Sequence, residues 1–122
     1  MPANSSGTRI WVSGEYPPVA STPLVVNHGL VNINPLHCRC DVLVKCIVAE
    51  SGEYRVGDFA INPMTLFMQN GVGHPYSLLP ALTTSTIQLN MMHHLVASFK
   101  TSTIGNQQLN MSNWRFIFRI FY

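Results

Sequence analysis

The run Cys38–Ala49, CRCDVLVKCIVA, limits the possible folds more than any other part of the sequence, because it alternates between two kinds of side chain. One face is wholly apolar and consists of Cys38, Cys40, Val42, Val44, Cys46 and Val48. The other face mixes charged and apolar side chains: Arg39, Asp41, Leu43, Lys45, Ile47 and Ala49. A period of two predicts a β-strand, and the β-branched residues in its middle favour the same structure. Because both faces carry apolar residues, we expect this strand to lie centrally in a sheet, ending at the turn signal Ser51-Gly52.

The amount of charge in the chain is low for a soluble domain. Charged residues make up 10% of the sequence and hydrophobic residues 47%, whereas ordinary soluble domains carry about 25% charged residues. A soluble monomer normally needs more surface charge than this. The deficit predicts that part of the surface is covered in an assembly, and a poorly soluble monomer is the alternative.

Length and charge also limit the domain organisation and the partners. A chain of 122 residues can bury about two-thirds of its unfolded surface, so we expect one domain over residues 8–122 behind a flexible N-terminal arm, residues 1–7. The net charge of +2 is too small for nucleic-acid binding, which needs clustered Lys and Arg. The sequence has no signal-peptide pattern and no run of about 20 apolar residues. We therefore expect synthesis in a cytoplasm, and neither nucleic acid nor membrane as a partner.

Strand patterns recur along the rest of the chain, separated by glycine and proline. They cover residues 8–16, 24–28, 54–56, 59–68 with a division at Asn62-Pro63, 87–91, 95–99 and 114–122. The last run places Trp114, Phe116, Phe118, Ile120 and Tyr122 on one face, which must be buried. Many short strands without helical periodicity predict an all-β fold, an antiparallel β-sandwich of jelly-roll type, with a small barrel as the alternative.

Residues 70–84 form the least regular segment, because glycine and proline interrupt every period. We expect a long surface loop here, and such loops often contact partners. The candidate contact residues are Gly71, Val72, Gly73, His74 and Tyr76.

The ionisable residues do not form a recognisable catalytic or metal-binding pattern. The acids are Glu15, Asp41, Glu50, Glu53 and Asp58. No two of them can be placed at the separation that glycoside hydrolysis requires, and neither a nucleophile elbow nor a phosphate loop is present. We therefore expect no enzyme, no catalytic residue and no cofactor. A depolymerase site assembled across subunits is an open alternative.

The three cysteines lie on one face of the expected central strand. Cys38, Cys40 and Cys46 are predicted to be reduced core thiols, because cytoplasmic synthesis keeps thiols reduced. The adjacent His37 points to the opposite face, which argues against zinc. Likewise His93 and His94 are neighbours and cannot face the same side of one strand. No metal is expected.

Several short motifs have a simple structural interpretation. His28-Gly29 and Gly57-Asp58 suit tight turns, because glycine tolerates positive φ and aspartate can accept bonds from nearby amides. The expected core and turn residues are His28, Gly29, Val42, Val44, Tyr54, Gly57, Asp58 and Trp114.

The order of these motifs resembles a small β domain of virion structural proteins of tailed bacteriophages. The motifs are His28-Gly29-Leu30, Pro35, the valine-rich run, Ala49-Glu50 with Tyr54-Arg55-Val56-Gly57-Asp58, and Asn113-Trp114-Arg115. In that family the pattern reads approximately His-Gly-Leu-Gly, proline, a hydrophobic strand, Gly-Tyr-Ser-Val-Gly-Asp and Asn-Trp-Arg. Here Val31 replaces a glycine, Glu53 stands where glycine is usual and Phe59 where an acid is common. Residues 64–82 have no counterpart in the pattern.

The resemblance implies a role on the virion surface, on the capsid or the tail, after assembly in the host cytoplasm. We expect a capsid decoration or cement protein, most simply a homotrimer, whose partners are its own copies and the major capsid protein or another virion protein. A tail-fibre or tail-tip module that binds host-surface glycan is the alternative. The short N-terminal arm favours decoration, because a fibre tip needs a shaft before it.

The candidate oligomer or capsid interface lies on the terminal strand. Arginine next to apolar residues is common in protein interfaces. The second face of this strand has that composition, with Arg115, Ile117, Arg119 and Phe121.

Overall fold

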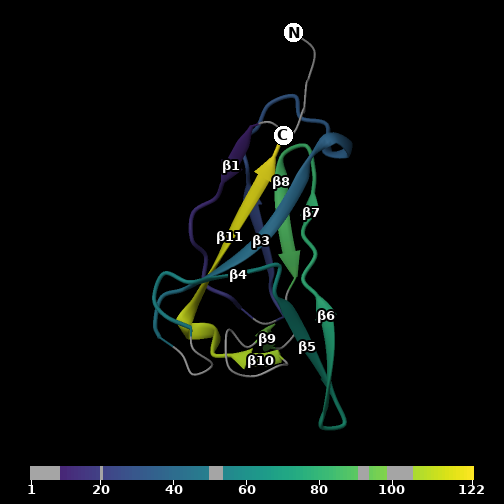
Figure 1. Ribbon diagram of the computed structural model, residues 1–122. Helices are drawn as coiled ribbons and strands as arrows, with labels where there is room; N and C mark the ends of the chain where they lie inside the picture. The colour runs from purple at the N-terminus through teal and green to yellow at the C-terminus, as the bar shows by residue number, and fades with distance from the viewer. Residues whose placement is uncertain (1–8, 20, 50–53, 91–93, 99–105) are drawn as a thin grey trace.

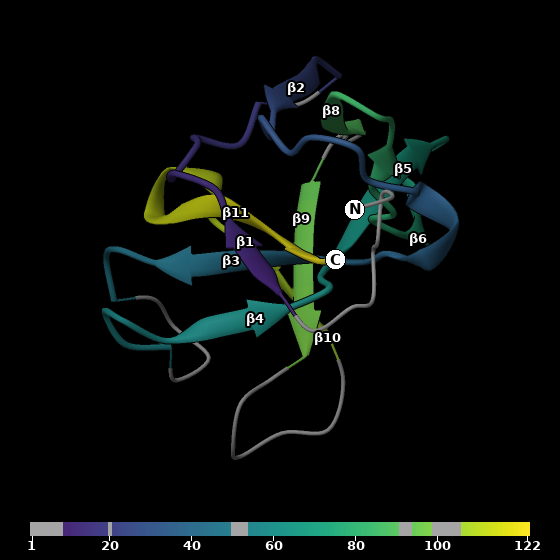
Figure 2. The same cartoon turned by 90° about the horizontal axis from the view of Figure 1, so that it is seen from above.

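The computed structural model describes residues 9–19, 21–49, 54–90, 94–98 and 106–122. The strands are β1 (Ile10–Val12), β2 (Pro23–Asn27), β3 (Arg39–Cys46), β4 (Phe59–Ile61), β5 (Met64–Gln69), β6 (Val72–Ser77), β7 (Ala81–Leu82), β8 (Thr86–Asn90), β9 (His94–Ser98), β10 (Asn106–Leu109) and β11 (Trp114–Phe121). Two short 3-10 turns, η1 (Pro35–His37) and η2 (Met111–Asn113), precede β3 and β11. The strands pair antiparallel in the orders β1-β11-β3-β4, β10-β9-β5-β6 and β2-β8-β7 (Figures 1 and 2). The predicted all-β class is confirmed.

The first sheet is built around β3 and β11, which pair along their whole length from Trp114↔Cys46 to Phe121↔Arg39. β4 pairs with the other edge of β3, so the predicted central position of this strand is confirmed. In β11 every second residue is buried, as the alternating aromatic pattern predicts. The strands therefore form where the sequence has its longest runs of period two.

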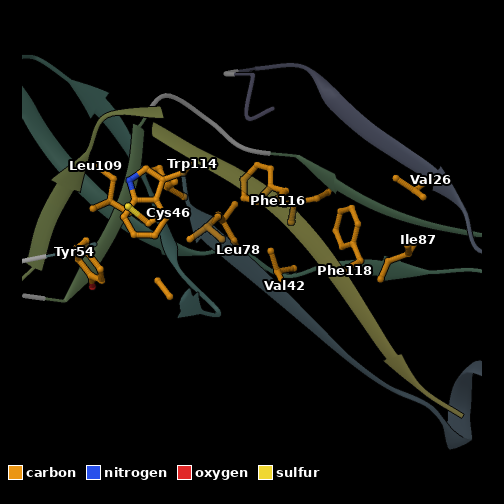
Figure 3. Packing of buried hydrophobic residues seen from close by; sticks show 14 of the residues in the cluster. Val26, Val42, Cys46, Tyr54, Leu78, Ile87, Leu109, Trp114, Phe116 and Phe118 are labelled. Atoms are coloured by element: carbon orange, nitrogen blue, oxygen red, sulfur yellow. The ribbon is translucent and has the colours of Figure 1, made fainter. Parts of the chain in front are cut away.

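Among the described residues, one hydrophobic core joins side chains from all three sheets (Figure 3). Its largest fully buried residues lie on β3, β8, β9 and β11: Trp114, Phe116, Phe118, Ile87, Leu95, Ile120, Val42, Val44 and Cys46. The Tyr54 ring meets Trp114 edge to face, with 4.9 Å between the ring centres. Each such side chain stabilises the fold by about 1.5–3 kcal/mol through burial, so this cluster is the main source of stability.

The apolar face of β3 is shorter than the sequence pattern predicts. Val48 is 50% exposed, although the alternation predicts it to be on the core face. The strand ends at Cys46 because the chain bends there, with Ile47 N–H and Val48 N–H both donating to the Asn113 carbonyl. At the other end, Cys38 and Cys40 are partly exposed, and only Cys46 is fully buried.

The predicted surface loop over residues 70–84 is wrong. The chain forms a β-hairpin, in which β5 and β6 pair from Met64↔Ser77 to Gln69↔Val72 around the turn Asn70-Gly71. Both turn residues have positive φ, 51° and 76°, which is the geometry that an Asn-Gly pair adopts in two-residue hairpin turns. The glycine and proline of β6 are tolerated because β6 is an edge strand and lacks a neighbour on one side.

Candidate interaction site

The outer face of the first sheet brings together residues that are far apart in the sequence. Cross-strand partners share a face, and the inner positions are those of Val44, Ala60 and Phe116. The outer positions therefore form one surface, which we call the arginine face. It consists of Ile10, Val12, Arg39, Asp41, Leu43, Lys45, Phe59, Ile61, Arg115, Ile117, Arg119 and Phe121.

The apolar part of the arginine face is open to solvent. Ile10, Val12, Phe59 and Ile61 are 57%, 56%, 48% and 59% exposed. The strand register places Ile61 opposite the buried Leu43, and Leu43 opposite the half-buried Ile117. Ile10 and Val12 lie opposite Phe121 and Arg119 on the other side of β11, and Phe59 lies opposite Lys45. Single exposed apolar residues are normal on a protein surface, but a contiguous group of them marks an interaction site.

The carboxylates of the arginine face are already paired within the chain. Arg119 donates to Asp41 Oδ2 from Nε at 3.1 Å and from Nη2 at 2.7 Å. Glu15, at the margin of the face, accepts a bond from Lys45 Nζ at 3.1 Å. Both carboxylates therefore have a basic partner within the chain. Arg39 and Arg115 are the other two arginines of this face.

The other two arginines of this face contact neutral groups. The Arg39 guanidinium lies 4.1 Å from the centre of the Phe121 ring, a cation–π arrangement. Arg115 Nη1 donates to the Trp114 carbonyl at 2.7 Å and to the Ser112 carbonyl at 3.4 Å. Within the described ranges, neither arginine has a carboxylate partner. The arginine face therefore carries a surplus of positive charge.

The four interface residues predicted from the sequence all lie on this face. Arg115, Ile117, Arg119 and Phe121 project from β11 at successive odd positions. Sequence reasoning missed Arg39, Phe59 and Ile61, since the pairing of β3 and β4 with β11 cannot be read from a single strand. It also predicted a strand over residues 8–16, without a signal that would show which face of that strand is exposed.

The predicted partner-contact residues of the surface loop lie instead in the β5–β6 hairpin. Gly71 occupies the turn, and Val72, Gly73, His74 and Tyr76 belong to β6. Val72 and His74 are exposed, and the hairpin projects from the lower end of the molecule in the view of Figure 1. These residues are remote in sequence and pairing from the arginine face.

The remaining predicted residues have structural positions. Gly57 has a φ of 93° in a turn in which Asp58 Oδ2 accepts the Arg55 N–H at 2.8 Å. Gly29, with a φ of 68°, follows the buried His28. Val42, Val44, Tyr54 and Trp114 all belong to the core cluster.

His28 links two connections of the fold. Its Nδ1 accepts the Leu30 N–H at 3.0 Å, and its Nε2–H donates to the Thr83 carbonyl at 3.0 Å. The ring is 4% exposed and meets Trp11 edge to face. Both ring nitrogens are therefore engaged within the chain, and His28 acts as a structural bridge between the residues after β2 and the β7–β8 turn.

The thiols of Cys38 and Cys40 lie near the start of β3. Burial, together with the neighbouring Cys38 and Asp41, raises the pKa of Cys40 to about 11, which keeps this thiol protonated and unreactive at neutral pH. Among the described residues, no group of three His, Cys, Asp or Glu side chains could hold a metal ion. In the same part of the chain, no helix is long and apolar enough to cross a membrane.

An apolar cleft of about 190 Å³ lies beside the segment that joins β1 to β2. Tyr16 and Pro17 line one part of it, and Leu89 and Phe116 line another. The walls of this cleft contain no charged residue.

Comparisons with protein families, with curated proteins and with solved structures give no match for this chain.

Proposed function

We propose that this chain is a structural protein of a tailed-bacteriophage virion, specifically a capsid decoration or cement protein that forms homotrimers on the particle surface. It has no enzymatic activity in this proposal, and its partners are its own copies and the major capsid protein or another virion protein. The arginine face carries the proposal. An exposed sheet face that combines apolar residues with arginine is the composition of a protein-binding surface.

The proposal includes an antiparallel β-sandwich of jelly-roll type. Two observations support it: the antiparallel sheets share one core, and Val26 and Ile87 from the β2-β8-β7 sheet belong to the same cluster as Phe118 from the first sheet (Figure 3). Together with the motif order that resembles virion proteins, this architecture suits a compact subunit that adds to a preformed surface.

The alternative, a tail-tip module that binds host glycan, is less well supported by the arginine face. Sugars bind by stacking on open aromatic rings beside polar groups. Phe121 lies under the guanidinium groups of Arg39 at 4.1 Å and Arg119 at 5.2 Å. The ring is therefore engaged within the chain, and a protein partner fits this face better than a sugar.

The test is binding to capsids of the same phage prepared without this protein. The double substitution Val12→Glu with Ile61→Glu places charge on two exposed positions of the arginine face and should abolish cosedimentation with the capsids. Val56→Glu, at a 65% exposed turn position, is the matched control and should bind normally. Circular dichroism must show that all variants fold.

Unchanged binding by the double variant would overturn the proposal. The proposal would also be overturned if the wild-type protein did not bind the capsids and bound a glycan instead, since this result would establish the tail-tip alternative.

A further inference from the structure

The charged residues are confined to part of the molecule. Residues 16–38 and 59–99 contain no Asp, Glu, Lys or Arg. These segments form β2 and all strands from β4 to β9. Figure 2 shows β2, β8, β5 and β6 gathered on one side, away from β1, β3 and β4. Apart from β4, the strands of these segments belong to the β10-β9-β5-β6 and β2-β8-β7 sheets. The charged strand residues all lie on β3 and β11 of the first sheet, so the other two sheets form an uncharged side.

The β2-β8-β7 sheet presents an exposed outer face on the uncharged side. Leu24, Val26, Ile87 and Leu89 point into the core, so the alternate positions point outward. These positions, with the adjacent Leu79, form what we call the uncharged face: Pro23, Val25, Asn27, Leu79, Ala81, Gln88 and Asn90.

The uncharged face combines apolar contact area with amides. Val25 is 54% exposed and Leu79 78% exposed. A hollow of about 370 Å³ lies on it, lined by Pro23, Leu79, Ala81, Gln88, Leu89 and Asn90. This surface therefore combines a hollow, apolar side chains and hydrogen-bonding amides, and it has no ionic group.

The edge of the same sheet adds backbone groups to this surface. His28 N–H donates to the Ser85 carbonyl, so the alternate residues Val26 and Leu24 bond towards β8. The backbone N–H and C=O groups of Val25 and Asn27 therefore point away from β8, on the outer side of an edge strand. Edge strands of this kind readily pair with another chain.

We propose that copies of this chain associate through the uncharged face, which lies towards the symmetry axis of the oligomer. Residues close to such an axis meet their own counterparts in the other copies, so charged residues there would repel one another. Asn27, Gln88 and Asn90 avoid this penalty, because an amide carries both donors and acceptors and can pair with another copy of itself. The arginine face, with its surplus of positive charge, is unsuited to the axis and stays free for a different protein.

This inference depends on the proposed function only for the number of copies, which is three. Self-association itself can be tested without capsids. Light scattering should show an oligomer of the wild-type protein at micromolar concentration. Gln88→Glu and Gln88→Lys each place like charges near the axis and should weaken association at least about tenfold. An equimolar mixture of the two variants should restore the oligomer, because opposite charges then meet. Position 88 is exposed and polar, so both variants should fold.

Ile61→Glu, on the arginine face, is the matched control and should leave the oligomer intact while it removes capsid binding. A monomeric wild-type protein would overturn the inference. Dissociation by Ile61→Glu with no effect at position 88 would also overturn it, because the arginine face would then be the contact between copies. A wild-type oligomer that does not bind capsids would contradict the proposed function alone, so the two failures are distinguishable.

Discussion

At the scale of single residues, the buried His28 side chain joins two separate connections of the fold through hydrogen bonds. It satisfies one backbone donor and one backbone acceptor in a site that is 4% exposed. An unsatisfied buried polar group costs about 1–3 kcal/mol. His28→Ala removes the partner of both Leu30 and Thr83 and should lower the free energy of unfolding by about 2–4 kcal/mol.

Urea denaturation measures this loss, and His37→Ala is the control. His37 is exposed at the end of η1 and its replacement should change stability by less than about 0.5 kcal/mol. If the two substitutions changed the free energy of unfolding equally, the hydrogen bonds of His28 would have no special part in holding the fold together.

The thiols give a prediction that depends on pH. Cys46 should react with iodoacetamide only after unfolding, because it is fully buried. Cys40 is partly exposed, but its pKa of about 11 against a reference of 9.0 keeps it protonated. Its alkylation rate should therefore still be rising between pH 9 and pH 11, where an ordinary thiol reaches its plateau.

The same shift predicts a loss of stability in alkali. The folded state holds the Cys40 proton more strongly than the unfolded state, so its contribution is complete below pH 9 and is lost as the pH rises towards 11. Cys40→Ser should flatten this part of the stability curve, measured by denaturation at a series of pH values. A plateau of Cys40 alkylation at pH 9 would contradict the shifted pKa.

At the scale of the elements, β11 and β3 supply most of the large, fully buried side chains. Trp114 is fully buried against Tyr54, and Trp114→Ala should destabilise the protein by about 3–5 kcal/mol through the cavity it leaves. Val48→Ala is the informative comparison, because the strand pattern placed Val48 on the same face as Val44. It is half exposed beyond the end of β3 and should cost less than about 1 kcal/mol, as thermal or urea unfolding will show. A large loss of stability in Val48→Ala would mean that the core extends past the end of the strand.

The two longest strands could be predicted from the sequence, and most of β5 lies within the expected strand over residues 59–68. β6 could not be predicted with the same reasoning. In β3 and β11 one face is continuously apolar, so the period is visible in the sequence. In β6 glycine and proline interrupt the period, yet an edge strand tolerates both. The Asn70-Gly71 pair was the available signal, because its positive φ values are those of a tight hairpin.

The candidate site was predictable only in part for a similar reason. The residues on β11 follow from alternation within one strand, whereas their neighbours Arg39, Phe59 and Ile61 depend on which strands pair and in which register. Local pattern does not specify long-range pairing, so most of the arginine face required the structure.

At the scale of the whole molecule, the separation of charge predicts two different responses to salt. Binding through the arginine face draws on the positive charge of Arg39 and Arg115, and added NaCl screens it. Self-association through the uncharged face should be unchanged or slightly strengthened. Capsid binding should therefore weaken as NaCl is raised from about 50 to 500 mM, while the oligomer persists, as cosedimentation and light scattering will measure. Parallel loss of both would mean that one surface serves both contacts.

The pairing of β1 with β11 has a consequence for how the chain acquires its structure. Ile10 lies opposite Phe121, and the backbones of Arg9 and Tyr122 bond to each other in both directions, at 2.8 and 2.9 Å. These contacts close a loop that runs from residue 9 to residue 122, and β3 too obtains its main partner from a segment that is synthesised much later. Contacts of such long range form slowly. During synthesis the apolar face of β3 therefore stays exposed until β11 has been made, and aggregation competes with folding during that interval.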